Sequence, residues 1–335
     1  MAQPGQTATD PSGFGPFFDR RFYDEVTPQV ARVDIGRFVN AYLVDARSND
    51  EGQRSWVLVD TGTPGSAEQI QHAAEARYGP EGARPEAIIL THGHDDHSGS
   101  ARALAETWNV PIYAHERERP FLDGRSAYPA PDPTVGGALA FVSRFMSGGR
   151  IDVGPRLETL PAGGRVPGLP GWEWIATPGH APGHVALFDP ETRTLLAGDA
   201  LTTSDQDRWS NLALRRRRLA RAPTPFTPDW PAAQQSTRRL AERSPRVVAA
   251  GHGLPMHAAS LPSATLADEL ERLAEAPIAP PQGRYVGHPP ETDPDEGLVH
   301  APPPPDDPLP RRAATAAGLA GAAAFGYALW KRRRR

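Results

Sequence analysis

The stretch Thr-His-Gly-His-Asp-Asp-His-Ser-Gly at residues 91–99 carries most of the information about this chain. It follows a short apolar run at residues 87–90, which predicts a buried strand. The stretch therefore lies in the loop after the C-terminal end of a strand, where open α/β folds place their ligands. Its histidines and carboxylates suit zinc, iron or manganese, and they are numerous enough for two ions.

Three later stretches repeat this pattern, in which a strand is followed by glycine and one metal-competent side chain. These side chains are His180, Asp199 and His252, after strands predicted at residues 172–177, 194–197 and 247–250. Glycine lets the backbone turn tightly beside a ligand. A single histidine or aspartate after a strand is weak evidence, because it usually caps an element or packs in the core. Four such strand ends in one chain predict a metal site.

This ordered set of motifs resembles the metallo-β-lactamase-fold hydrolases, in particular their glyoxalase II-like branch, over about residues 30–260. The resemblance extends to the stretches at residues 39–44, 58–62 and 177–184. It implies a first metal position, a second metal position and a ligand that bridges them. By motif position, the first would be formed by His92, His94 and His180, the second by Asp96, His97 and His252, and the bridge by Asp199.

The same resemblance implies an α/β fold, a four-layer αββα sandwich of two mixed sheets with helices outside. The sequence agrees coarsely, with strand-like runs at about 30–35, 38–45 and 55–60. Helices are expected at residues 66–78, 98–108, 229–243 and 263–274, with Gly79 closing the first and Asp229 and Ser263 as N-caps. Residues 110–114 predict an edge strand, because Pro111 cannot donate a ladder hydrogen bond.

The resemblance implies a zinc-dependent hydrolase with two divalent ions, manganese and iron being the alternative metals. A metal-bridging hydroxide would cleave an ester-like bond (a thioester, a lactone or another ester) in a small molecule, and Asp96 would orient it as well as bind metal. The substrate itself is not predicted, because related enzymes cut thioesters, lactones, β-lactams, phosphodiesters and sulfate esters with much the same metal ligands. Thr202 departs from the pattern of homoserine-lactone lactonases, which have tyrosine there. Two alternatives share the fold: a mononuclear iron persulfide dioxygenase and a nucleic-acid-processing phosphodiesterase.

Several other residues are assigned roles outside the ligand set. Asp60 follows a strand and is a candidate for orienting a ligand histidine. We interpret His184 as a residue behind the ligands, and His115 and His257 as ordinary surface or core histidines. The arginines at residues 215–218 and 221 either line the site and attract an anionic substrate or form a solvated loop, and the loop is favoured.

Composition narrows the classes of function. The chain has no cysteine, which excludes disulfides and thiolate metal ligands. Its net charge of −4 does not predict nucleic-acid binding. No basic-then-apolar leader is recognised at the N-terminus, so a cytoplasmic catalytic domain is expected.

The chain divides into four parts: a partly disordered lead-in (1–28), the catalytic domain (29–276), a semi-extended linker with twelve prolines (277–310) and an apolar helix with a basic end (311–335). Within the last part, residues 313–330 carry no charge and are flanked by basic residues, at 311–312 and at 331–335. This pattern predicts a helix that anchors in or lies on a membrane, with a loose alanine-rich helix as the alternative. No oligomeric state is predicted.

Overall fold

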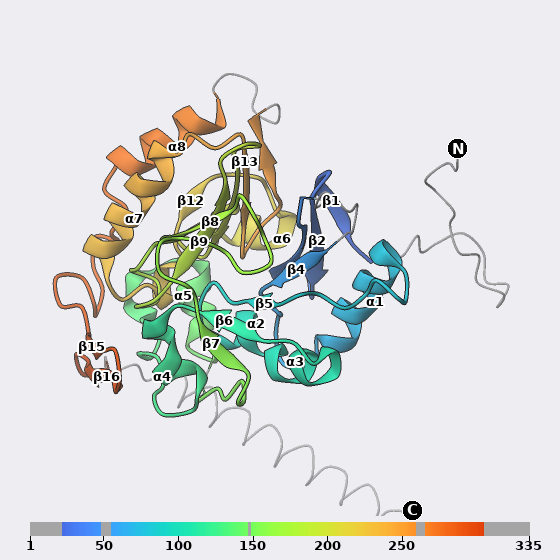
Figure 1. The fold of residues 1–335 in the computed structure, drawn as a ribbon. Helices are drawn as coiled ribbons and strands as arrows, with labels where there is room; N and C mark the ends of the chain where they lie inside the picture. The colour runs from blue at the N-terminus through green and yellow to red at the C-terminus, as the bar shows by residue number, and fades with distance from the viewer. Residues whose placement is uncertain (1–21, 48–54, 147–148, 259–264, 305–335) are drawn as a thin grey trace, which may run out of the picture.

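A computed structural model of the chain describes residues 22–47, 55–146, 149–258 and 265–304, and two mixed sheets form its centre (Figure 1). The seven-stranded sheet has the order β1-β2-β3-β4-β5-β6-β7 and is antiparallel up to β4 and parallel from β4 to β7. Its strands are β1 (Asp24–Thr27), β2 (Val30–Ile35), β3 (Val39–Asp45), β4 (Trp56–Val59), β5 (Ile88–Ile89), β6 (Ile112–Ala114) and β7 (Leu157–Thr159).

The five-stranded sheet has the order β14-β13-β10-β9-β8, with one parallel pair, β13 and β10. Its strands are β8 (Glu173–Ala176), β9 (Val185–Asp189), β10 (Thr194–Gly198), β13 (Val247–Ala250) and β14 (Met256–His257). Two small hairpins complete the strands of the described chain: β11 (Leu201–Thr202) with β12 (Ala220–Arg221), and β15 (Glu291–Asp293) with β16 (Gly297–His300).

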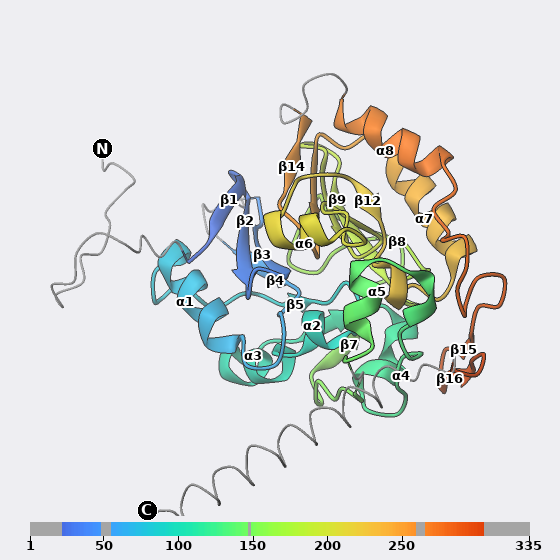
Figure 2. The same cartoon turned by 180° about the vertical axis from the view of Figure 1, so that it is seen from behind.

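Helices lie outside the sheets and in the loops that follow the strands (Figures 1 and 2). The α-helices of the described residues are α1 (Ala67–Tyr78), α2 (Asp95–Ser98), α3 (Ala101–Trp108), α4 (Arg119–Leu122), α5 (Ala138–Ser143), α6 (Trp209–Leu214), α7 (Trp230–Glu242) and α8 (Leu266–Glu275). Three 3-10 helices accompany them: η1 (Glu116–Glu118), η2 (Pro133–Val135) and η3 (Thr224–Phe226).

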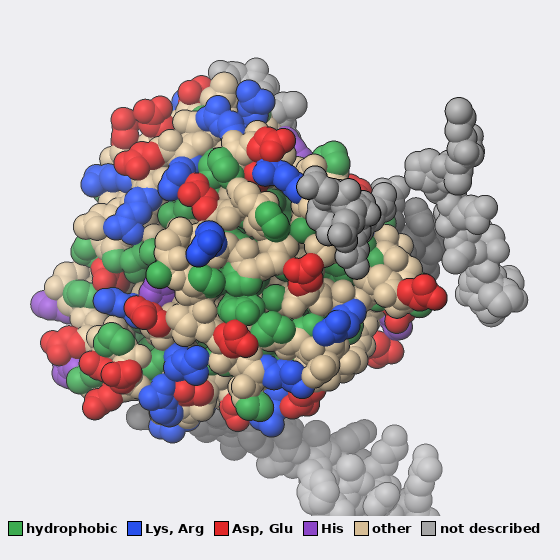
Figure 3. All heavy atoms as spheres, in the orientation of Figure 1, with side chains coloured by type: hydrophobic (Ala, Val, Ile, Leu, Met, Phe, Trp, Pro, Cys, Tyr) green, Lys and Arg blue, Asp and Glu red, His purple; other side chains and the backbone are tan. Residues whose placement is uncertain are grey.

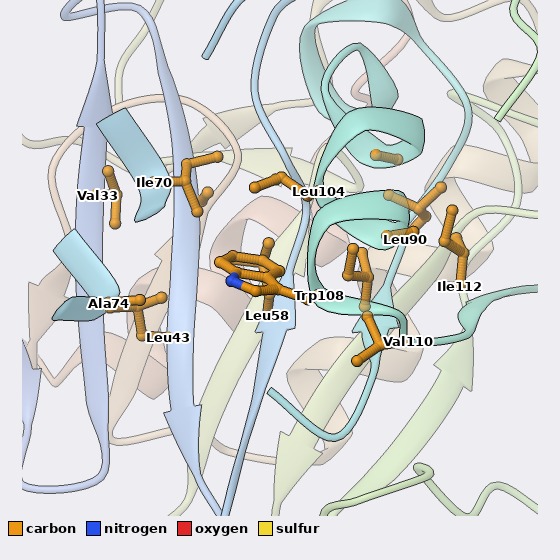
Figure 4. Close-up of a cluster of buried hydrophobic side chains, with 14 of the residues drawn as sticks. Val33, Leu43, Leu58, Ile70, Ala74, Leu90, Leu104, Trp108, Val110 and Ile112 are labelled. Atoms are coloured by element: carbon orange, nitrogen blue, oxygen red, sulfur yellow. The ribbon is translucent and has the colours of Figure 1, made fainter. Parts of the chain in front are cut away.

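Three hydrophobic clusters define how the layers stack. The first, which includes Ile70 and Leu104, packs α1 and α3 against the seven-stranded sheet (Figure 4). The second, which includes Val59 and Leu187, fills the space between the two sheets. The third, which includes Leu240, packs α7 and α8 against the five-stranded sheet. This order of helices, sheet, sheet and helices agrees with the layering that the resemblance implies.

Local signals in the sequence explain where the longer helices begin and end. Gly79, at a φ of 76°, closes α1 and donates its N–H to Glu75 O, as its position predicts. The Asp229 side chain accepts the Ala232 N–H and caps α7, which confirms that prediction. Helix α8 is capped by a capping box that starts at Thr265. The predicted cap Ser263 lies outside the described residues.

One prediction about the strands is wrong. The strand predicted to be an edge, β6, is paired on both sides, with β5 and β7. Pro111 precedes the paired residues and only its carbonyl takes part, accepting the Ile88 N–H, so its missing N–H costs the ladder nothing. The helix predicted at residues 98–108 is present as α3 but begins later, at Ala101. Just before it, the Ser100 hydroxyl donates to Thr63 O.

Residues 277–304 pack against the domain, so the predicted semi-extended linker is not confirmed for them. Ile278 is buried against Trp230, and Tyr285 is buried with its hydroxyl donating to a backbone carbonyl. The β15–β16 hairpin is tied to the domain by Leu298 N–H, which donates to Ser126 Oγ. The physical reason is burial: apolar side chains stand among the prolines and gain more from packing than from remaining in water.

The two ends of the chain are described only in part. β1 lies within the predicted lead-in and extends the seven-stranded sheet, so this sheet begins before residue 29. The rest of the lead-in, residues 1–21, and the predicted apolar helix, within residues 305–335, lie outside the described residues. Among the helices that are described, none has the length and apolar character needed to cross a membrane.

Candidate metal centre

The predicted ligands come from loops at the ends of strands in both sheets. The loop after β5 carries His92 and His94 and runs into α2, which lies at the middle of the molecule in both ribbon views (Figures 1 and 2). Helix α2 itself carries two further candidate ligands, Asp96 and His97. The second sheet supplies His180 after β8, Asp199 after β10 and His252 after β13.

Three histidines converge at the predicted first metal position. His94 Nδ1 lies 3.0 Å from His92 Nε2 and 2.9 Å from His180 Nε2. His92 is fully buried and His180 nearly so. Because three ring nitrogens with lone pairs repel one another at this distance, the arrangement is favourable only with a proton or a cation between them.

The predicted second metal position lies beside the first, and Asp199 lies between them. Asp199 Oδ2 is 3.5 Å from both His180 Nε2 and His97 Nε2, and 3.0 Å from His252 Nε2. Asp96 Oδ2 is 3.8 Å from His97 Nε2 and 3.5 Å from His252 Nε2. The fold thus brings all seven predicted ligands into one continuous cluster.

Hydrogen bonds behind the cluster set the tautomers of His92 and His97. Thr91 Oγ1 donates its own proton to Asp60, so at 3.1 Å it accepts a proton from His92 Nδ1. His97 Nδ1 donates to Asp60 Oδ2 at 2.8 Å. This contact agrees with the prediction that Asp60 orients a ligand histidine. Since each Nδ1 holds a proton, the neutral ring presents its Nε2 lone pair to the cluster.

The two histidines from the five-stranded sheet are oriented in the same way. His252 Nδ1 donates to Phe38 O at 2.7 Å. His180 Nδ1 lies 3.3 Å from Thr227 Oγ1, whose own proton is directed to Pro223 O. All four Nε2 atoms therefore face inward, which is the arrangement that metal-binding histidines adopt.

The residues present fit a pair of cations. His97 Nε2 and Asp199 Oδ1 are buried without a hydrogen-bond partner among the described residues. A buried polar atom left unpaired costs free energy, and a cation held by nitrogen and carboxylate ligands would remove that cost. The chemistry of the donor set, five imidazoles and two carboxylates, is that of zinc, iron or manganese sites.

Comparison with known proteins agrees with this geometry. The model of the metallo-beta-lactamase superfamily matches residues 34–252. The chain belongs to this superfamily. The probable metallo-hydrolase YflN of Bacillus subtilis (strain 168) is 40% identical to it over 221 residues, which are 66% of this chain and 82% of that protein.

A solved structure shares the fold. A beta-lactamase domain protein from Burkholderia ambifaria has a TM-score of 0.51 and 21% identity, with 78% of each chain covered. TTHA1623, solved in a di-iron-bound form, has a TM-score of 0.45 and 28% identity, with 68% of this chain and 93% of that chain covered. The glyoxalase II-like branch is not singled out by these similarities.

The cluster of this superfamily domain has two halves with opposite electrostatics. At the first metal position burial lowers the pKa of His92 and His180 well below the usual value, and that of His94 to about 4. At the second, burial also disfavours the charged ring, but the carboxylates outweigh it and raise the pKa of His97 and, to about 9, that of His252. The first half is therefore neutral near pH 7, and the second holds protons where cations would bind.

His184 lies behind the cluster and is not available as a ligand. Its Nε2 accepts the backbone N–H of Asp199 at 2.8 Å, and its Nδ1 pairs with Thr177 Oγ1 at 2.7 Å. Burial lowers the pKa of His184 to about 3, which keeps the accepting nitrogen free of a proton. His184 thus positions Asp199, in agreement with its interpretation from the sequence. His115 caps η1 by accepting the Arg117 N–H and belongs to none of the candidate metal-binding groups of the described residues.

The ion pairs of Arg215 and Arg221 give them neither of the two roles considered for the arginine run. Arg215 Nη1 lies 2.6 Å from Asp34 Oδ2, and Arg221 Nη2 lies 2.8 Å from Asp207 Oδ2. These two side chains therefore hold neighbouring segments together. Arg216 is exposed, as a solvated loop predicts.

Gly251 approaches the centre so closely that a side chain there should disturb it. A Cβ at this position would lie 2.2 Å from Asp199 Oδ1 and 2.5 Å from His97 Cε1. We expect Gly251→Ala to lower zinc affinity about 10–100-fold, the range seen when ligands are displaced through their neighbours. Gly149→Ala is the matched control, because no atom lies within 4 Å of its added Cβ. Equal zinc affinity of the two variants in a chelator competition would contradict this expectation.

Three residues of the site were not predicted from the sequence. Thr227 orients His180, and Glu118 and Tyr128 contact the backbone of the His92–His94 loop. No strand end or motif marks them, and only spatial proximity reveals their role.

Proposed function

We propose that this chain is a hydrolase that depends on two divalent ions. His92, His94 and His180 would hold the first, Asp96, His97 and His252 the second, and Asp199 would contact both. The observation that carries the proposal is the set of inward-facing nitrogens around Asp199 Oδ2, each fixed by a hydrogen bond on its outer side. The name of the relative YflN, probable metallo-hydrolase, supports the same class of activity.

The ions and the two carboxylates of the centre would have different roles in the reaction. When bound, the ions would lower the pKa of a coordinated water and polarise the oxygen of the bond to be cleaved. Asp199, almost fully buried, supplies negative charge between the two positions. Asp96 is partly exposed, with 33% of its side chain accessible, so its carboxylate can also accept a hydrogen bond from the attacking water and orient it. Asp96 is the residue we assign to catalysis.

The substrate class that we propose is an ester-like bond in a small molecule, such as a thioester or a lactone. Zinc is the metal that we favour, with manganese or iron as alternatives. A mononuclear iron dioxygenase would need only part of the cluster, whereas both predicted positions have a full set of candidate ligands. A nucleic-acid enzyme would benefit from a surface of one sign, but on the face in Figure 3 basic and acidic side chains are interspersed.

Metal removal tests the proposal directly. For whichever substrate of a test panel the protein hydrolyses, chelation is expected to lower the rate at least about 100-fold, because no ion would then activate water. Adding zinc or manganese should restore the rate. The measurement is a panel of thioesters, lactones, aryl esters and phosphodiesters, run on protein of known metal content. Full hydrolysis after verified metal removal would exclude the mechanism. One iron per chain with oxygen consumption would favour the dioxygenase.

A further inference from the structure

A buried carboxylate lies behind the first metal position and belongs to no predicted motif. Glu118, the last residue of η1, has a fully buried side chain. Among the described residues it forms no ion pair with a lysine or arginine. Burying a carboxylate without a cation costs free energy, so hydrogen bonds must replace the hydration that Glu118 loses.

Those hydrogen bonds come from both loops that carry the first three histidines. Glu118 Oε2 accepts the Gly93 N–H at 2.9 Å, and Gly93 stands between His92 and His94. Glu118 Oε1 accepts the Gly183 N–H at 2.6 Å, and Gly183 is in the loop that carries His180. One carboxylate therefore ties together two loops that come from different sheets.

Tyr128 completes this arrangement from the other side. Its hydroxyl donates to Glu118 Oε2 and accepts the Gly93 N–H at 2.9 Å. Its ring stacks on Phe121, and its centroid is 4.2 Å from that of His94. The ring thus limits the rotation of His94, and the hydroxyl links that ring to the carboxylate.

Both glycines fit this arrangement closely. A Cβ at Gly93 would lie 2.6 Å from the Tyr128 hydroxyl, and a Cβ at Gly183 would lie 2.9 Å from Glu118 Cγ. Any side chain at either position would push the loop away from the carboxylate. The backbone N–H groups can therefore reach Glu118 only because these positions are glycine.

We propose that Glu118 and Tyr128 are positioning residues that fix the distance between His94 and His180 and so set the metal affinity of the first position. The inference rests on the proposed function, because it assumes that these histidines bind an ion. Neither residue contacts the ion itself. Their effect passes through the Gly93 and Gly183 N–H groups, in the way that residues behind a metal ligand control its orientation.

The test compares three variants of the full chain with a neighbouring control. Glu118→Gln retains the side-chain shape and one acceptor oxygen, and Tyr128→Phe removes only the hydroxyl. In Glu118→Gln the Tyr128 hydroxyl still accepts the Gly93 N–H, so the double variant should lose far more than either single one. Glu116→Gln changes an exposed carboxylate on the same 3-10 helix and is the control.

The measurements are zinc affinity by chelator competition, the visible spectrum of the cobalt(II)-loaded protein and the melting temperature of the metal-free protein. We expect the double variant to bind zinc at the first position about 10–100-fold more weakly. Its cobalt spectrum should shift because the ligand geometry changes. The single variants should lie between it and the wild type, and Glu116→Gln should match the wild type.

The results separate this inference from the proposed function. If the double variant melts at a lower temperature but its folded form keeps wild-type zinc affinity and cobalt spectrum, the pair is merely structural and the inference is overturned. If the double variant does not fold, the same two readouts on Tyr128→Phe decide. Failure of the wild-type protein to bind any ion would instead overturn the proposed function.

Discussion

Asp199→Ala is expected to lower kcat/KM by about a thousandfold or more and to leave fewer than two ions on each chain. The reason is that Asp199 Oδ2 lies within 3.5 Å of His97, His180 and His252, so both halves of the cluster depend on its charge. Metal ions supply several kcal/mol of transition-state stabilisation, and about 1.4 kcal/mol corresponds to a factor of ten in rate. Losing even part of that stabilisation gives the expected effect.

The measurement pairs steady-state kinetics with metal analysis of the same preparation. Asp152→Ala is the matched control, since Asp152 is an exposed carboxylate whose only ion pair among the described residues is with Arg102. It should keep two ions and full activity. A metal content of two with unchanged turnover in Asp199→Ala would show that this carboxylate neither bridges ions nor supports the reaction.

The site could be predicted because its chemistry is concentrated at strand ends. His180, Asp199 and His252 each follow a predicted strand and stand next to glycine, a local signal that needs no knowledge of the fold. The strands themselves could be predicted because their pattern of apolar residues is also a local signal. The register of β10 beside β13 then brings Asp199 and His252 to one edge of the sheet.

The supporting contacts could not be predicted, because they depend on distance in space and not on sequence pattern. His252 donates to the carbonyl of Phe38, and every residue has a carbonyl, so no residue type marks that position. Glu118 differs from the exposed Glu116 only in the direction it faces. For the proline-rich segment, composition predicts an extended chain, whereas in the described residues 277–304 apolar side chains such as Ile278 pack against the domain.

The two metal positions are expected to differ in how their affinities depend on pH. In the metal-free protein burial lowers the pKa of His94 to about 4, so the first position is free of protons near neutral pH. At the second position burial acts in the same direction, but Asp199 and Asp96 outweigh it and raise the pKa of His252 to about 9. A cation must displace that proton before it can bind His252 Nε2.

Zinc affinity at the second position should therefore rise between about pH 6.5 and pH 9, by at most about tenfold per pH unit for each proton released, whereas the first position should change little. The stability of the metal-free protein depends on pH in the opposite sense: it falls as the pH rises. A pKa raised above the unfolded value of 6.5 gives His252 a stabilising effect on the metal-free protein that is complete below about pH 6.5 and is lost as the pH rises through about 9.

Metal analysis at fixed free zinc across this pH range measures how the zinc affinity of the two positions differs in its pH dependence. Calorimetry in two buffers of different ionisation enthalpy counts the protons released on binding. The first position serves as the internal control, because both affinities come from one sample. Acidification should remove the second ion before the first. Equal pH dependence at the two positions would mean that Asp199 and Asp96 do not hold His252 protonated, and the division of charge within the cluster would be wrong.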